Sequence, residues 1–109
     1  MRPRVDILQF EPALSYGLVE YLGTLQMPGE RGFSPCDCIL HGGHQFGLNL
    51  AAGLGLGGNE PYPDVFRPLI GFADSIAVID GRVAMPDLPG VGFEAKDELY
   101  SQLLDLLEC

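Results

Sequence analysis

One stretch of the sequence, from His41 to Glu60, restricts the possible folds more than any other. The apolar run CDCIL precedes His41, and two glycines, Gly42 and Gly43, follow it. A helical pattern comes next, and a glycine-rich segment then leads to Glu60. This order predicts a strand, a tight turn, a helix and a short strand. Because the carboxyl ends of parallel strands lie on one face of a sheet, we expect His41 and Glu60 to point into one cavity.

The residues before this stretch repeat the order of strand and helix. Residues 5–10 (VDILQF) form an apolar run of strand length, which Pro12 ends because the residue before a proline prefers extended geometry. Between residues 13 and 25, apolar side chains recur every three or four positions, which is typical of one face of a helix. The next predicted elements are a strand at 36–40, a helix at 45–54 and a strand at 56–60. Alternating strands and helices predict an α/β fold with parallel pairing and right-handed crossovers.

The second part of the chain, residues 61–109, is richer in turns. Two prolines at its start predict an extended loop over residues 61–75. Asp80 and Gly81 suit the turn of a hairpin formed by residues 77–84. Residues 96–107 predict a closing helix with Leu99, Leu103 and Leu106 or Leu107 buried. We therefore divide the chain into residues 1–60, which hold three strand–helix units, and residues 61–109, which hold the loop, hairpin and helix.

Composition disfavours several classes of partner. The chain of 109 residues is 47% hydrophobic, which suits one domain or a piece of a larger one. Its formal net charge of −9 disfavours nucleic acid and anionic membranes as partners, because no basic patch is available to neutralise phosphates, so we expect neither. The three cysteines are an odd number and no apolar leader precedes them, so we expect a reducing, cytoplasmic location. No apolar run approaches the roughly 18 residues of a membrane helix.

Three side chains are candidates for chemistry, each with a plainer alternative. His41 suits proton transfer, because the unperturbed imidazole pKa of about 6.5 lies close to neutral pH; it would otherwise hydrogen-bond a loop carbonyl. Glu11, after the first strand, would orient the His41 ring, or else be solvated. Glu60 would contact a substrate hydroxyl or carboxylate or act as an acid, or else be a loop carboxylate. His44 more often caps a helix or meets solvent, and Cys36 and Cys38 favour packing over metal binding.

At these residues the sequence resembles a known family. The run LHGGHQFGLNLAAGLGLGGNEPYPDVF resembles the last catalytic strands of the mandelate racemase branch of the enolase superfamily. The tail IDGRVAMPDLPGVGFEAKDELY is similar to the usual ending of that family. With DILQFEPALSYGLVEYL, the resemblance covers almost the whole chain. Within the branch, the sequence is most similar to D-tartrate dehydratase and related acid-sugar dehydratases.

The resemblance implies a modified TIM barrel, (β/α)7β, with a separate capping domain. This chain would supply the last three strands and the closing tail, and would be incomplete as a domain. His41 matches the catalytic histidine that ends the seventh strand, and Glu60 matches the acidic residue that ends the eighth. Glu11 falls at the dyad position that ends the sixth strand, where the family usually has aspartate.

The activity implied by the resemblance is that of a hydro-lyase. Such enzymes remove the proton α to the carboxylate of a small hydroxy acid or acid sugar, and a hydroxyl then leaves as water. Mg²⁺ stabilises the enediolate intermediate. The metal carboxylates and a lysine acid/base come from strands that precede residue 1, so no metal ligand is assigned here. We expect the chain alone to be inactive and the full-length enzyme to be a homo-oligomer.

Two alternatives to the dehydratase remain open at this point. The chain would instead be a truncated, non-enzymatic barrel piece that associates with a partner or with itself through its exposed strand edges. It would also fit a racemase or epimerase of the same superfamily.

Overall fold

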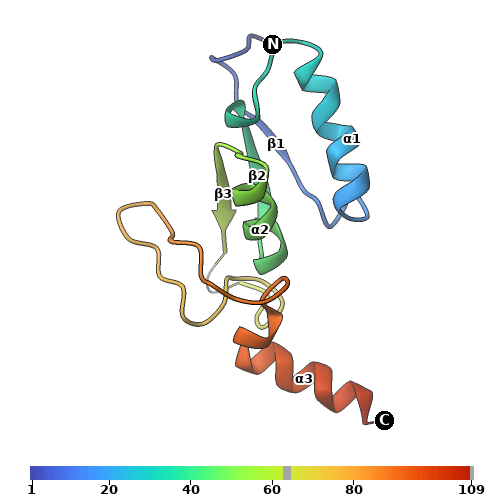
Figure 1. Ribbon diagram of the computed structural model, residues 1–109, viewed down its shortest axis with the longest axis vertical. Coiled ribbons are helices and arrows are strands. Elements are labelled where there is room, and N and C mark those ends of the chain that lie inside the picture. The colour runs from blue at the N-terminus through green and yellow to red at the C-terminus, as the bar shows by residue number, and fades with distance from the viewer. Residues whose placement is uncertain (63–64, 109) are drawn as a thin grey trace.

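A parallel sheet of three strands lies at the centre of the structure (Figure 1). This computed structural model describes residues 1–62 and 65–108. The strands β1 (Leu8–Phe10), β2 (Cys38–Gly43) and β3 (Gly58–Pro61) lie in the order β1-β2-β3, and both pairings are parallel. The predicted α/β class and parallel pairing are confirmed. Cys109 and part of the predicted loop at 61–75 lie outside the described residues.

The helices are α1 (Leu18–Gly29), α2 (Gln45–Gly53) and α3 (Asp97–Leu107). The second agrees with its prediction to within a residue, but the first begins five residues later than predicted. The cause is local, because the backbone turns at residues 11–16 and both Tyr16 and Gly17 adopt positive φ angles of 61° and 108°. A helix cannot continue through these angles, so Leu14 is left 77% exposed.

The strand boundaries also shift relative to the prediction. A short 3₁₀ helix, Pro35–Asp37, replaces the start of the second predicted strand, because Ser34 and Asp37 cap each other's backbone. The strand β2 then continues past His41 to Gly43. As a result Cys38 is buried in packing as predicted, whereas Cys36 lies outside the strand and is exposed.

The hydrophobic core lies on one face of the sheet, beneath α1 and α2. Tyr21, Leu40, Leu50 and Ala51 form its buried centre, and partly buried apolar side chains surround them: Phe10, Leu25, Phe46, Leu54 and Leu56. Side chains alternate along a strand, so the neighbours of Phe10 and Leu40 point to the opposite face. That face carries Gln9, Ile39 and His41, which are exposed or half-buried. The side chains that could take part in chemistry therefore lie on the face opposite the core.

The tail after β3 contains the predicted turn but not the predicted hairpin. Asp80 and Gly81 have φ angles of 50° and 70°, as a type I′ turn requires. Beside it lies only an isolated bridge between Ile79 and Arg82, so residues 77–84 do not form paired strands. Ile79 is 68% exposed, and without apolar burial the arms gain too little to pair further.

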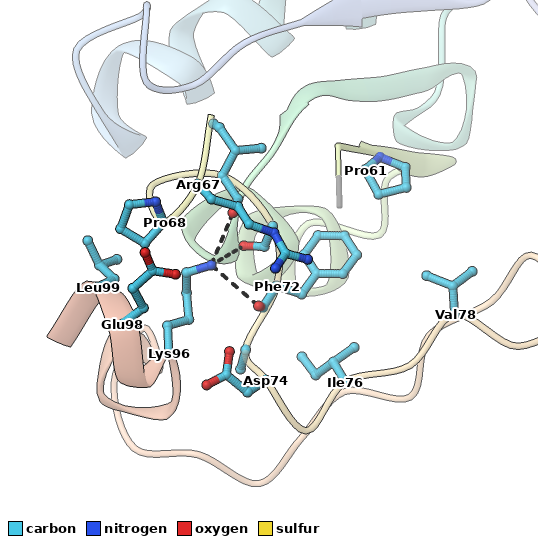
Figure 2. A pocket seen from close by; sticks show the side chains of 13 residues that line it. Pro61, Arg67, Pro68, Phe72, Asp74, Ile76, Val78, Lys96, Glu98 and Leu99 are labelled. Atoms are coloured by element: carbon cyan, nitrogen blue, oxygen red, sulfur yellow. Dashed lines mark hydrogen bonds between the residues drawn. The ribbon is translucent and has the colours of Figure 1, made fainter. Parts of the chain in front are cut away.

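The loop that precedes the turn is tied to the start of α3. The Lys96 ammonium is buried and donates hydrogen bonds to the carbonyls of Ile70 at 3.2 Å, Gly71 at 3.0 Å and Phe72 at 3.4 Å (Figure 2). The amide of Gly71 also donates to the carbonyl of Gly43 at 2.8 Å, which joins this loop to the end of β2. These bonds hold the tail against the carboxyl end of the sheet.

The closing helix α3 leads away from the sheet, and only its first turn is packed (Figure 1). Leu99 is buried, as predicted. The rest of the predicted buried stripe is wrong, since Leu103, Leu106 and Leu107 are 40%, 70% and 82% exposed. The helical spacing of these leucines was recognised correctly, but none of the described elements covers them.

Candidate functional site

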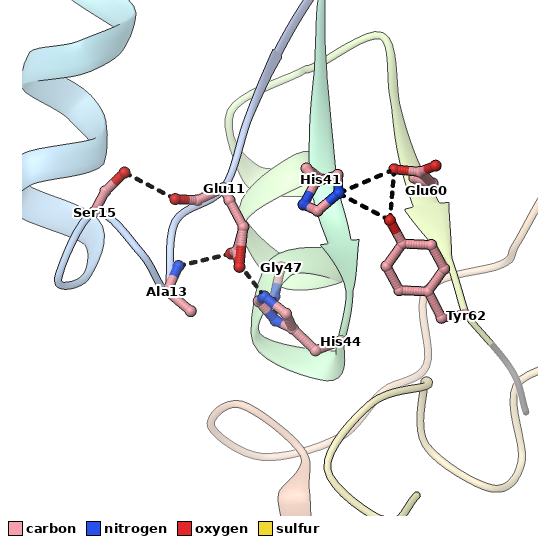
Figure 3. A network of polar contacts seen from close by, with 8 residues as sticks. All are labelled: Glu11, Ala13, Ser15, His41, His44, Gly47, Glu60 and Tyr62. Carbon is pink, nitrogen blue, oxygen red and sulfur yellow. Dashed lines mark hydrogen bonds and ion pairs between the residues drawn. The ribbon is translucent and has the colours of Figure 1, made fainter. Parts of the chain in front are cut away.

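His41 and Glu60 meet at the carboxyl ends of neighbouring strands (Figure 3). The Nε2 atom of His41 lies 3.7 Å from the Oε2 atom of Glu60. Register explains this approach, because Leu40 pairs with Asn59 and the next residue along each strand is His41 or Glu60. Their side chains remain 44% and 41% exposed. The two side chains meet as predicted, but neither lines a described cavity, so they meet on an open surface and not in the predicted cavity.

Tyr62 bridges the two groups. Its hydroxyl oxygen lies 2.9 Å from His41 Nε2 and donates a hydrogen bond to Glu60 Oε2 at 3.0 Å. The Tyr62 ring meets the imidazole edge-on, with ring centroids 5.8 Å apart. Sequence reasoning missed Tyr62, although its position two residues after Glu60 was a usable signal, because side chains two apart in an extended segment share a face.

Gln9 completes this set of contacts from the other side. Its amide Nε2 donates to Glu60 Oε2 at 2.7 Å. Gln9 pairs in register with Ile39, two residues before His41, so it lies on the same open face of the sheet. This residue was also missed, because its position in the register is visible only once the strands are paired. We call Gln9, His41, Glu60 and Tyr62 the open-face cluster.

Electrostatics keep the Tyr62 phenol protonated. Partial burial raises the pKa of Tyr62, and the hydrogen bond to Glu60 and the charge of that carboxylate raise it further. The phenol is therefore a hydrogen-bond donor at neutral pH. It holds the Glu60 carboxylate in place rather than competing with it for a proton.

Glu11 does not contact His41, which corrects the predicted pairing. Its Oε1 atom instead lies 3.0 Å from Nε2 of His44, and it accepts a second hydrogen bond from the amide of Ala13 at 2.7 Å. Two features redirect the carboxylate. The strand β1 ends at Phe10, so Glu11 belongs to the following turn, and Gly42, with a φ angle of 109°, turns the end of β2.

The glycine is needed at this crossing. A Cβ atom on residue 42 would lie 3.1 Å from the Glu11 carboxylate and 3.0 Å from the His44 ring. A Cβ atom at these distances would force the Glu11 or His44 side chain to shift, and only glycine adopts this φ angle without strain.

His44 has a structural role, in agreement with the prediction that it caps a helix. It is the N-cap residue of α2, and its Nδ1 atom accepts a hydrogen bond from the amide of Gly47 at 2.8 Å. Since Nδ1 is the acceptor, the ring proton lies on Nε2 and is donated to Glu11. Both ring nitrogens are engaged and the residue is buried, so His44 has no free atom for proton transfer.

A cavity beside the loop that precedes α3 does not contain the open-face cluster. It measures about 440 Å³ and lies between the loop at 67–78 and the first turn of α3 (Figure 2). Arg67, Asp74, Lys96 and Glu98 supply its polar groups. Burial lowers the pKa of Lys96, but its three carbonyl partners already occupy its donors. His41 and Glu60 therefore converge on an open surface, not in this cavity.

No known protein-family profile matches the sequence. Within residues 1–62 and 65–108, no group of three histidine, cysteine or acidic side chains is placed to hold a metal ion. None of the helices in the described part combines the length and the apolar character needed to cross a membrane.

Proposed function

We propose that this chain supplies one side of the active site of a hydroxy-acid dehydratase of the enolase superfamily. One observation carries the proposal. His41 and Glu60 lie near the carboxyl ends of neighbouring parallel strands, 3.7 Å apart, and keep nearly half of their surface exposed. In sheets of this kind, catalytic groups gather at the carboxyl ends of the strands. The substrate class we infer is a small acid that bears hydroxyls on the two carbons next to its carboxylate.

The chemistry follows from the two exposed groups. The hydrogen on the carbon α to the carboxylate leaves as a proton, and the electrons of that bond form a double bond to the next carbon. The hydroxyl of that second carbon departs as water after it gains a proton. His41 either accepts the first proton or supplies the second, and Glu60 orients a substrate hydroxyl. The enol product then rearranges to a 2-keto acid.

Mg²⁺ belongs to the proposal, but the described residues do not fit it. They contain no group of three ligands for the ion, so we derive no step through it from this chain. The ion would be held by carboxylates of strands that this chain does not contain, and it would stabilise negative charge on the substrate carboxylate. Those strands would also complete the (β/α)7β barrel, in which the present sheet forms the last three strands.

The open face of the sheet supports an arrangement with further strands. Parallel sheets are normally covered on both faces. Here Ile7, Gln9 and Ile39 leave one face exposed or half-buried, beside the open-face cluster. Additional strands would cover this face and enclose His41 and Glu60. The same need for cover is consistent with the homo-oligomer that the family resemblance implies.

A second candidate function rests on the exposed apolar side chains. Leu103, Leu104, Leu106 and Leu107 are 40–82% exposed on α3. Such a surface favours association, so a non-enzymatic role as a binding piece is the alternative. The two candidates differ in one respect that can be measured, namely whether hydroxy acids are turned over.

The test supplies the missing strands as a second polypeptide. It would carry the capping domain and first five strands of an acid-sugar dehydratase, mixed with this chain, Mg²⁺ and a panel of acid sugars. We expect 2-keto acid to form with the mixture and with a Tyr100→Phe control, but not with either polypeptide alone. In D₂O, exchange of the α hydrogen without loss of water would assign a racemase instead. A complex that binds Mg²⁺ yet neither forms keto acid nor exchanges hydrogen would refute the proposal.

A further inference from the structure

The open-face cluster has more acceptors than protons, and this fixes the direction of its hydrogen bonds. An ionised carboxylate can only accept, so the single hydroxyl proton of Tyr62 is donated to Glu60 Oε2 at 3.0 Å. The Tyr62 oxygen must then accept at its other contact, which joins it to His41 Nε2 at 2.9 Å. The proton on His41 therefore lies on Nε2.

From this geometry we infer that Tyr62 is a positioning residue that leaves Nδ1 of His41 as the atom that exchanges protons with the substrate. The hydrogen bonds run in one direction, from His41 Nε2–H to the Tyr62 oxygen and from the Tyr62 hydroxyl to Glu60. Among the described residues, none hydrogen-bonds His41 Nδ1. The assignment of the tautomer rests on geometry alone, whereas its catalytic meaning rests on the proposed function.

The same hydrogen bonds give the two carboxylate oxygens of Glu60 different roles. Oε2 accepts from both Tyr62 and Gln9, at 3.0 Å and 2.7 Å. Within the described part of the chain, Oε1 has no such donor, so it is the oxygen available to a substrate hydroxyl. Gln9 and Tyr62 together hold the carboxylate through Oε2. A substrate would therefore meet Nδ1 of His41 and Oε1 of Glu60.

The imidazole tautomer can be observed directly by ¹⁵N NMR of the two histidines. The chain contains only His41 and His44, so the spectrum has two ring systems to assign. At about pH 8.5, where free imidazole is neutral, we expect both rings to carry their proton on Nε2. His44 serves as an internal control, because the Gly47 amide fixes its tautomer independently of the open-face cluster.

Glu60→Leu is the decisive variant. Without the carboxylate, His41 Nε2 at 2.9 Å is the one acceptor that the described residues place in contact with the Tyr62 hydroxyl. We therefore expect His41 to change to the Nδ1–H form, with the Nε2–H population falling below half. His44 should remain Nε2–H, which also shows that the variant is folded. Wild-type His41 in the Nδ1–H form, or no change of its tautomer in a folded Glu60→Leu variant, would overturn the inference.

Activity in the two-polypeptide assay separates this inference from the proposed function. Tyr62→Phe should lower kcat by about 10- to 100-fold with KM nearly unchanged, because the ring loses its fixed orientation. Tyr100→Phe should leave both constants unchanged. If the predicted tautomers are seen but no substrate is turned over, the proposed function fails while the hydrogen-bond assignment stands. If turnover occurs but Tyr62→Phe does not alter kcat, the positioning role is refuted.

Discussion

The cap of α2 offers a prediction whose size follows from one contact. His44→Ala removes the acceptor for the Gly47 amide, a bond of 2.8 Å in a buried position. Loss of an N-cap side chain costs about 1 to 2 kcal/mol. Near room temperature this corresponds to an increase of about 5- to 30-fold in the population of the opened first turn. Hydrogen exchange at the Gly47 amide should accelerate by that factor, because exchange reports local opening.

Matched variants separate the cap from the contact with Glu11. Asparagine is a good N-cap residue, so His44→Asn should keep the protection of Gly47 to within about threefold while it loses the bond to Glu11. Glu11→Gln keeps an oxygen that can accept a hydrogen bond from His44 Nε2. This variant should therefore also preserve the protection of the Gly47 amide. The Tyr100 amide, which donates to the carbonyl of Lys96 in α3, is a distant reference. Unchanged exchange at Gly47 in His44→Ala would refute the assigned cap and, with it, the tautomer of His44.

Three further predictions concern stability, measured as the free energy of unfolding in urea. Tyr21→Phe should stabilise the protein by about 1 kcal/mol, since the buried Tyr21 hydroxyl has no partner among the described residues; lower stability would show that the hydroxyl is satisfied. Burial raises the pKa of Tyr21 to about 12, above its ordinary value of 10.0, so the unfolded chain loses this proton first. Stability should therefore fall from pH 10 to 12 in wild type and fall less in Tyr21→Phe; equal slopes would contradict this. Gly43→Ala should destabilise the protein by more than about 2 kcal/mol, because its Cβ would lie 2.4 Å from the Glu60 carbonyl. Unchanged stability would contradict this close approach of the Gly43 and Glu60 backbones.

Sequence patterns predicted the elements that burial controls directly. The helix α2 and the parallel order of three strands followed from apolar periodicity, and Asp80–Gly81 followed from its preference for positive φ angles. The late start of α1 did not follow, because it depends on the turn after Glu11 and on the φ angle of Tyr16. For α3 the apolar residues do recur with helical spacing. Such a stripe indicates that one face of the helix can be buried, but it does not show that another element covers that face.

The candidate site was also predicted only in part, because some of its residues are placed by turns and by contacts between strands. His41 and Glu60 were found because strand ends can be located along the sequence. The partner of Glu11 was wrong because a carboxylate one residue beyond a strand is placed by its turn, here by the Ala13 amide, and not by strand register. Gln9 and Tyr62 were missed because ordinary polar residues acquire a role only through the contacts that the paired strands provide.

The most direct test of the account compares the two histidines in one assay of α-hydrogen exchange in D₂O. We propose proton transfer for His41, which is half exposed, whereas His44 caps α2 and has both ring nitrogens engaged. In the two-polypeptide complex, His41→Asn should lower the exchange rate by at least about 100-fold, whereas His44→Asn should keep most of it. Full exchange in His41→Asn, or loss of exchange in a folded His44→Asn complex, would contradict the central claim.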